Sequence, residues 1–300
     1  DSIAVTVERA LGGASVDSDG VIFRVTAAAQ DSEGRLFVLD QSAQQVVVFS
    51  AIGEYETRIG GPGNGPGELG TGSAGLLVQD SSVIVFDVGR GSLQFFSKDG
   101  RYIRHLRLAA TSGVTLGWSA SEDPNVALQS IQLVEAGDST GKAQVSILRR
   151  SLVTGAIIDT VVSKWIKSPV RIADGIPHFT LFTPELSWAT FSDGSIAIST
   201  GDKCQVEIVA SGLAPRTIKR ECRASRTSDA ERDAAAKLFA EGLRMQRAPD
   251  ALAQTLVRRL RYEAEHPVII SLLATGDTLF LERGDLTAQT FLRQSPAMQV

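Results

Sequence analysis

The sequence predicts an all-β protein built from repeated units, and three observations support that prediction. Glycine is abundant, with 28 of 300 residues, helical periodicity is rare, and short apolar runs alternate with turn residues along most of the chain. The composition, 43% hydrophobic and 21% charged, is typical of a folded globular protein. The net charge of −4 argues against nucleic-acid binding. No apolar run reaches the ~18 residues that a membrane span requires, so no transmembrane segment is expected.

A repeat organises the first third of the chain. Segments 33–55 and 82–102 each contain two apolar runs followed by a Gly-x-Tyr turn. Matching residues are 47 positions apart, namely Asp40 and Asp87, Phe49 and Phe96, Gly53 and Gly100, and Tyr55 and Tyr102. Forty-odd residues is the period of a four-stranded propeller blade. The sequence therefore predicts a β-propeller of four-stranded antiparallel blades, in which 36–39 and 83–86 are equivalent inner strands.

Three weaker copies follow, so five blades are visible in a single domain over residues 1–300. The third copy has apolar runs at 123–128, 144–148 and 156–162, the fourth spans 188–198, and the fifth spans 268–281. In each, an apolar run leads through a polar turn into a second one. This pattern suits the inner strands of a blade, which are buried on both faces.

Two segments interrupt the period. Residues 164–184 contain three prolines and are expected to form a long loop, whereas 227–265 is expected to be an inserted helical hairpin. Ser228 and Glu231 form a capping box at the start of a helix near 229–247, and a second helix is expected near 250–264. We expect the two helices to pack through Leu238, Leu252, Leu256 and Leu260. Because helices this short are marginal in water, they must dock on a blade or on a partner protein.

The repeats resemble a known family. Asp31-x-x-Gly-Arg-Leu-Phe-Val-Leu-Asp40, Phe49-Ser-x-x-Gly-x-Tyr55 and the glycine-rich segment 60–69 are similar to NHL-type repeats, and more narrowly to six-bladed β-propeller proteins that many bacteria export. The resemblance covers residues 20–108. It implies a sixth blade, with 5–11 as a closing strand and 298–300 as the start of another strand. It also implies a non-catalytic protein of the periplasm or exterior that holds a protein, peptide or glycan partner.

The glycine-rich segment 60–69 does not fit a phosphate-binding loop. It lacks the terminal Gly-Lys-Ser/Thr, and Glu68 would repel phosphate. We expect a connection between blades in which glycines take positive φ angles.

Asp40 and Asp87 allow two interpretations. They follow equivalent strands, where each carboxylate is expected to accept backbone N–H bonds in a turn. The alternative function is a metal-dependent hydrolase or lyase with Ca²⁺ at the channel mouth, for which Asp40, Asp87, Asp123 and Asp202 are the only candidate ligands that can be assembled. If the chain is not such an enzyme, no cofactor is expected.

The remaining polar signals are weak. His105, His178 and His266 show no metal-ligand spacing, although His178, beside Asp174, is the best single candidate for chemistry. The basic run 258–261, with Arg244 and Arg247, is interspersed with acidic residues, so we expect a solvated helix face that could still serve a partner.

Cys204 and Cys222 are the only cysteines in the sequence. A hairpin centred on Leu213 pairs residues whose numbers sum to 426, which places Cys204 opposite Cys222 and Glu207 opposite Lys219. The Cβ atoms of opposed residues lie near disulfide distance. We therefore expect a disulfide and an oxidising compartment.

Overall fold

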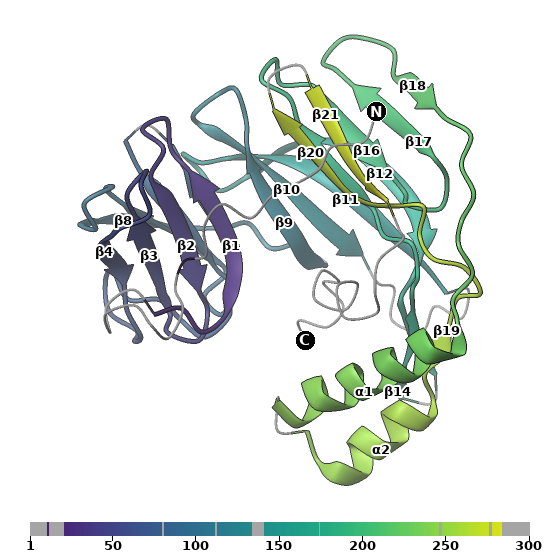
Figure 1. Cartoon of the computed structure of the whole chain (residues 1–300). Coiled ribbons are helices and arrows are strands. Elements are labelled where there is room, and N and C mark those ends of the chain that lie inside the picture. The colour runs from purple at the N-terminus through teal and green to yellow at the C-terminus, as the bar shows by residue number, and fades with distance from the viewer. Residues whose placement is uncertain are drawn as a thin grey trace. The chain divides into compact units, whose positions relative to one another are not determined.

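A computed structural model of the chain describes residues 11, 21–79, 81–111, 113–133, 141–173, 175–245, 248–275 and 278–283. These residues form mainly antiparallel sheets and two helices (Figure 1). The chain divides into two compact units. The first comprises Asp1–Thr111, Gly117–Gln129 and Leu148–Asp159, and the second comprises Ser112–Leu116, Ser130–Ile147 and Thr160–Val300.

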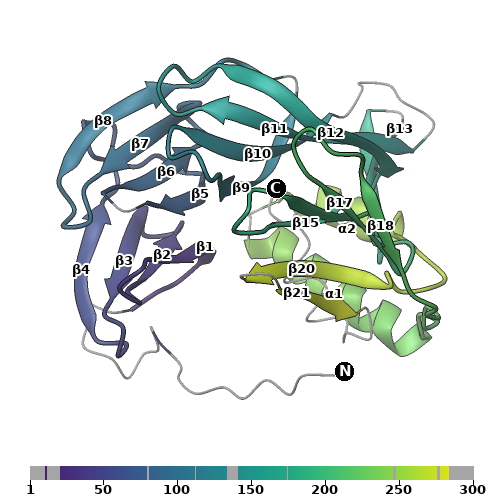
Figure 2. The same cartoon turned by 90° about the horizontal axis from the view of Figure 1, so that it is seen from above.

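The first unit contains two complete four-stranded antiparallel sheets, each with its strands in chain order (Figure 2). The first sheet consists of β1 (Val25–Gln30), β2 (Leu36–Asp40), β3 (Gln45–Phe49) and β4 (Tyr55–Gly60). The second consists of β5 (Ser73–Val78), β6 (Val83–Asp87), β7 (Ser92–Phe96) and β8 (Tyr102–Arg107). This is the blade pattern that the repeat predicts.

The 47-residue register is confirmed for three of the four strands. Strands β2, β3 and β4 match β6, β7 and β8 at this spacing, so the predicted equivalence of 36–39 and 83–86 is correct. Strands β1 and β5 are instead offset by 48 residues, because the connection to the next strand is one residue shorter in the second sheet. The two pairs of inner strands are almost wholly buried, whereas exposed positions of β4 alternate with half-buried ones and one buried residue, Ile59.

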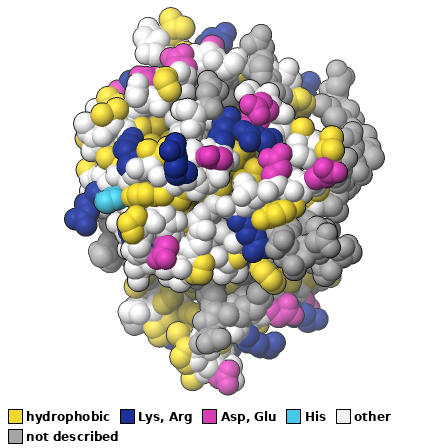
Figure 3. Space-filling view, turned by 90° about the vertical axis from the view of Figure 1, so that its left-hand side faces the viewer, with side chains coloured by type: hydrophobic (Ala, Val, Ile, Leu, Met, Phe, Trp, Pro, Cys, Tyr) yellow, Lys and Arg dark blue, Asp and Glu magenta, His cyan; other side chains and the backbone are white. Residues whose placement is uncertain are grey.

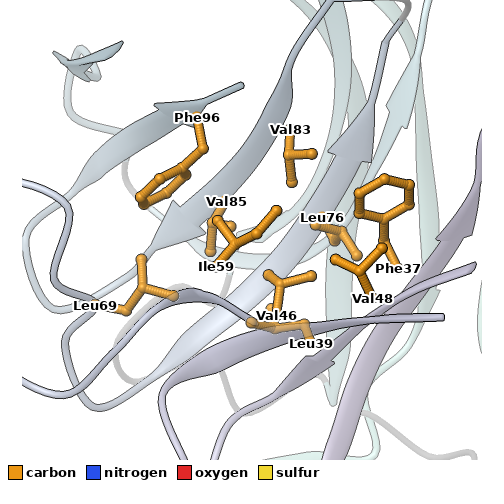
Figure 4. Packing of buried hydrophobic residues seen from close by; sticks show 10 residues of the cluster. All are labelled: Phe37, Leu39, Val46, Val48, Ile59, Leu69, Leu76, Val83, Val85 and Phe96. Atoms are coloured by element: carbon orange, nitrogen blue, oxygen red, sulfur yellow. The ribbon is translucent and has the colours of Figure 1, made fainter. Parts of the chain in front are cut away.

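Side chains from the two sheets form one hydrophobic cluster. Phe37, Leu39, Val46 and Val48 of the first sheet lie against Leu76, Val83, Val85 and Phe96 of the second (Figure 4). Each buried aliphatic or aromatic side chain of this kind contributes roughly 1.5–3 kcal/mol relative to exposure. The apolar residues of the repeat thus form the core between these two sheets.

The third sheet has the order β12-β11-β10-β9, and its residues belong partly to each unit. Its strands are β9 (Val114–Ala120), β10 (Val126–Leu133), β11 (Lys142–Ser151) and β12 (Ile157–Lys167). The weak third copy of the repeat is therefore a genuine four-stranded sheet.

The second unit contains the fourth and fifth copies. The fourth is a sheet of β15 (Ser187–Thr190), β16 (Ile196–Ser199), β17 (Gln205–Val209) and β18 (Arg216–Lys219). The fifth contributes β20 (Ile269–Thr275) and β21 (Thr278–Arg283), which pair in an antiparallel ladder. All five predicted pairs of strands are present, but the fourth pair, β15–β16, includes an edge strand of its sheet, and the described part of the fifth copy is a two-stranded sheet.

The prediction of a long loop at 164–184 is wrong. The segment contains the end of β12, then β13 (Val170–Ala173) and β14 (Ile176–Leu181), which pair with each other. Prolines are tolerated because Pro169 lies between strands, and Pro177 lies where β14 has a paired neighbour only on the β13 side. A proline lacks the N–H that a second neighbour would require.

The helical hairpin is present, but its second helix is shorter than predicted. Helix α1 spans Asp229–Met245 and α2 spans Asp250–Arg258. The residues that follow α2 do not continue the helix to 264, because β19 (Arg261–Tyr262) pairs in parallel with the end of β14. Leu238, Leu256 and Leu260 contribute to packing as expected, whereas Leu252 is 42% exposed.

Several expectations fall on residues outside the described part of the chain. These are the closing strand at 5–11, except Leu11, the strand start at 298–300, and Asp174 and Arg247. Leu11 packs against the cluster formed by Val38, Val47 and Phe49. No helix within the described ranges is both long and apolar enough to cross a membrane.

Candidate functional site on the helical hairpin

The hairpin docks on β14 through an aromatic cluster. Phe239 of α1 is 2% exposed, and its ring centroid lies 5.0 Å from that of Phe179. Ala235 of α1 and Leu256 of α2 are buried in the same cluster with Leu181. Both helices therefore have one face fixed against the strand, and this attachment orients their other face.

The start of α1 is held by a capping box. The Ser228 backbone N–H donates to Glu231 Oε2 at 2.8 Å, and the Glu231 N–H donates to Ser228 Oγ at 3.3 Å. Glu231 Oε1 also lies 3.1 Å from Nε2 of the buried His266. The Ser228 hydroxyl and backbone N–H, together with His266, hold the pKa of the Glu231 carboxyl below its usual 4.5. The capping box predicted from the sequence is confirmed.

A groove lies between the two helices, with a volume of about 500 Å³. Helix α1 lines it with Ala240 and Arg244, and α2 lines it with Asp250, Ala253, Gln254, Val257 and Arg258. The spacing explains the arrangement, because residues three or four positions apart share one face of a helix. The small alanine side chains leave the space open, and the charged residues lie around it.

The arginines of the groove are available to a ligand. Arg244 and Arg258 are exposed and lie in the last turns of their helices. Among the residues that the structure describes, neither guanidinium group has an ion-pair or hydrogen-bond partner, and neither does the Asp250 carboxylate. Both arginines stand out in the sequence as part of a basic cluster, whereas nothing in the local pattern marks Ala240, Ala253 and Val257 as lining a groove.

Asp40 and Asp87 serve as turn residues. Both are fully buried. The Asp40 carboxylate accepts the backbone N–H groups of Phe23 at 2.8 Å, Arg24 at 3.1 Å, Ser42 at 3.0 Å and Ala43 at 3.3 Å. Asp87 accepts the N–H groups of Gly70 and Arg90. The turn interpretation is therefore confirmed, since backbone donors occupy these oxygens.

The other metal candidates are also engaged locally. Asp123 accepts the backbone N–H of Asn125 at 2.8 Å, and Asp202 accepts the Thr200 hydroxyl at 2.6 Å. Within the described ranges, no group of three or more His, Cys, Asp or Glu side chains is arranged to hold a metal ion. The four candidate ligands thus each belong to a turn or a loop of their own.

The three histidines have different surroundings. His105 lies in β8, the outer strand of its sheet, and its Nδ1 is 3.1 Å from the Tyr102 hydroxyl. Arg259 Nη1 donates to His178 Nε2 at 3.3 Å, which ties β14 to the end of α2. His266 is 5% exposed and meets the Phe182 ring edge to face. Each histidine therefore makes a contact within its own unit.

Hydrogen bonds of Glu68 and of Arg90, from outside the segment, hold the glycine-rich segment 60–69. Gly60 and Gly67 have φ angles of 80° and 81°, as expected of a tight connection. Glu68 Oε2 accepts the Gly65 N–H at 2.5 Å, and Arg90 donates to the carbonyl oxygens of Gly63 and Glu68. The site that a phosphate would need is filled by these groups, which supports the structural interpretation.

The disulfide between Cys204 and Cys222 is present, with a Cα–Cα distance of 6.0 Å. The predicted strand register is wrong by two residues, because Val206 pairs with Ile218 and Glu207 with Thr217, whose numbers sum to 424. The turn centres on Gly212, whose φ of 71° suits glycine, rather than on Leu213. Cys204 therefore lies opposite Arg220, and the disulfide joins diagonal neighbours. Glu207 bonds to Lys164 instead of Lys219.

Charges of both signs lie side by side elsewhere on the surface. On the face drawn in Figure 3, the described Lys and Arg side chains alternate with Asp and Glu, and hydrophobic side chains are scattered among them.

The comparisons with known proteins support the fold. Residues 21–71 match a family described as a 6-bladed beta-propeller. The search of curated proteins finds no match. Among solved structures, the chain is similar to a putative exported protein from Bacteroides fragilis, with a TM-score of 0.51 and 13% identity over 95% of this chain and 77% of that chain.

Two further solved structures are more distantly similar. One is a member of the duf4221 family from Bacteroides vulgatus, with a TM-score of 0.41 and 12% identity over 74% of this chain and 67% of that one. The other is from a nidogen/laminin complex, with a TM-score of 0.46 and 10% identity over 86% and 72% of the two chains. No finding tests the NHL-type character of the repeats, which stays a prediction.

Proposed function

We propose that this chain, which is a β-propeller of the six-bladed type, is a non-catalytic binding or scaffolding protein that acts in the periplasm or outside the cell. The partner class is a protein or peptide, and the helical hairpin is the binding element. The Cys204–Cys222 disulfide supports the compartment, because such bonds persist in oxidising environments. The similar protein from Bacteroides fragilis is described as a putative exported protein, which agrees with that compartment.

The observation that carries the proposal is the groove on the hairpin. The groove is lined by arginines without described partners, and α1 and α2 are held by their opposite faces against β14. Insertions that lie outside the repeated sheets are a common place for binding surfaces on repeat folds. The alternative, a metal-dependent hydrolase or lyase with Ca²⁺, lacks comparable support, since backbone donors occupy Asp40 and Asp87.

Site-specific cross-linking in the producing cell tests the proposal. A photoreactive amino acid at Gln254, in the groove, should give an adduct with a second protein, whereas the same group at the exposed Arg101 should not. Alkylation under native conditions should find no free thiol. A protein that gives no adduct from Gln254 and carries two free thiols would contradict both the binding role and the compartment.

A further inference from the structure

The charges of the hairpin are unevenly distributed. Residues 237–261 contain six Lys and Arg and only two Asp and Glu, whereas the whole chain has a net charge of −4. The start of α1 is acidic, with Asp229 and Glu231 in its first turn. It lies next to the acidic segment 263–265, because Thr227 N–H donates to the Ala264 carbonyl oxygen. The hairpin thus has an acidic end at the start of α1 and a basic end that contains the groove.

The apolar surface of the basic end is recessed. Ala240, Ala253 and Val257 are half-buried in the groove. Among the side chains of the two helices that the structure describes, the exposed large hydrophobic residue is Leu252, which does not line the groove. A membrane-binding surface requires projecting apolar side chains that enter the lipid. A recess between two helices instead accepts a side chain that projects from a partner.

Resting on the proposed function, we infer that the groove binds an acidic segment of a partner protein. An apolar side chain of this segment enters between Ala240, Ala253 and Val257, and its flanking carboxylates pair with Arg244 and Arg258. Arginine suits this role because its planar fork matches the geometry of a carboxylate. Helix α2 has nine residues, so the groove extends for roughly 13 Å and accommodates about two turns of a helical peptide.

Selection from a display library of random 16-residue peptides tests the inference on the intact, oxidised chain. Enriched sequences should carry Asp or Glu on both sides of a Leu, Ile or Phe. A labelled peptide from this set should bind at least about tenfold more weakly to the double variant R244E/R258E. The matched control K237E/R261E changes the net charge equally at exposed positions outside the groove, and it should stay within about threefold of the native affinity.

A second pair of variants tests the groove itself. Ala253→Trp should fill the recess and weaken binding by at least about tenfold, whereas Ala251→Trp, on the exposed side of the same helix, should not. Circular dichroism and thermal unfolding should show that all variants remain folded. Enriched peptides without acidic residues, or equal binding to R244E/R258E and K237E/R261E, would overturn the inference.

The remaining outcomes separate the inference from the proposed function. If the adduct from Gln254 persists in cells that produce R244E/R258E, the chain is a binding protein but the acidic-segment assignment is wrong. Binding to phosphatidylglycerol vesicles, without enrichment of any peptide, would assign the basic end to a membrane surface and would also overturn the inference.

Discussion

Removal of the disulfide should lower the free energy of unfolding by about 3 kcal/mol. Cys204 and Cys222 are separated by 18 residues, and the chain-entropy relation for a loop of about this length gives roughly 3 kcal/mol at 25 °C. The disulfide stabilises the protein mainly through the unfolded chain, because the crosslink restricts the conformations of that chain. In the native structure, the bond closes the end of the β17–β18 ladder just beyond the Gln205–Lys219 pair.

The assay is urea unfolding of the native protein and of the double variant C204S/C222S, each with and without reductant. The reduced native protein should unfold at the same urea concentration as the variant, and reductant should not change the variant, which has no cysteine. Cys204 and Cys222 are half-buried and the adjacent strand β18 is exposed at all four positions, so little packing of the native protein depends on the cysteine side chains. An oxidised native protein that unfolds at the same urea concentration as C204S/C222S would refute the reasoning.

Three further predictions concern the turns and the hairpin. Asp40→Ala should destabilise the chain by about 3 kcal/mol, because four partly buried backbone N–H groups lose their acceptor, whereas Asp40→Asn should destabilise it less; urea unfolding measures both. Phe239→Ala should lower the free energy of opening of the hairpin by about 3–5 kcal/mol, because its side chain is buried. Leu252→Ala, at an exposed position, should change this free energy by less than about 0.5 kcal/mol. Hydrogen exchange of the helix amides measures both. The pKa of Glu231 is lower in the folded chain than its usual 4.5, so its stabilising effect is complete above that value and is lost as the pH falls through the folded pKa. Glu231→Gln should therefore flatten the acid dependence of hairpin exchange, and an unchanged slope would contradict this assignment.

The repeat made much of the fold predictable. Residues 47 apart determined which strands are equivalent, and the apolar inner strands indicated burial on both faces. The capping box of Ser228 and Glu231 and the turn role of Asp40 were also predictable. These features depend on contacts between residues close in sequence, so local chemistry identifies them.

The register of the β17–β18 strands and the end of helix α2 were harder to predict from the sequence. The disulfide was predicted correctly from a register that was two residues wrong, because a diagonal pair of cysteines also lies within bonding distance. The helical pattern after Pro249 continued past Arg258, yet Tyr262 pairs with β14. Competition between a helix and a strand neighbour cannot be read from periodicity alone.

The sequence by itself determined the propeller repeat, the cysteine pair and the helical hairpin, because the spacing of nearby residues predicts each of them. Only the tertiary structure decided that residues 164–184 form strands despite their prolines, and that Ala240 of α1 and Ala253 of α2 line one groove. It also decided the burial of Arg150, which donates to Gln129 and to the carbonyl oxygens of Ala109 and Gly155. The physical reason is that these contacts join residues from different elements, and their free energy depends on which surfaces meet when those elements pack.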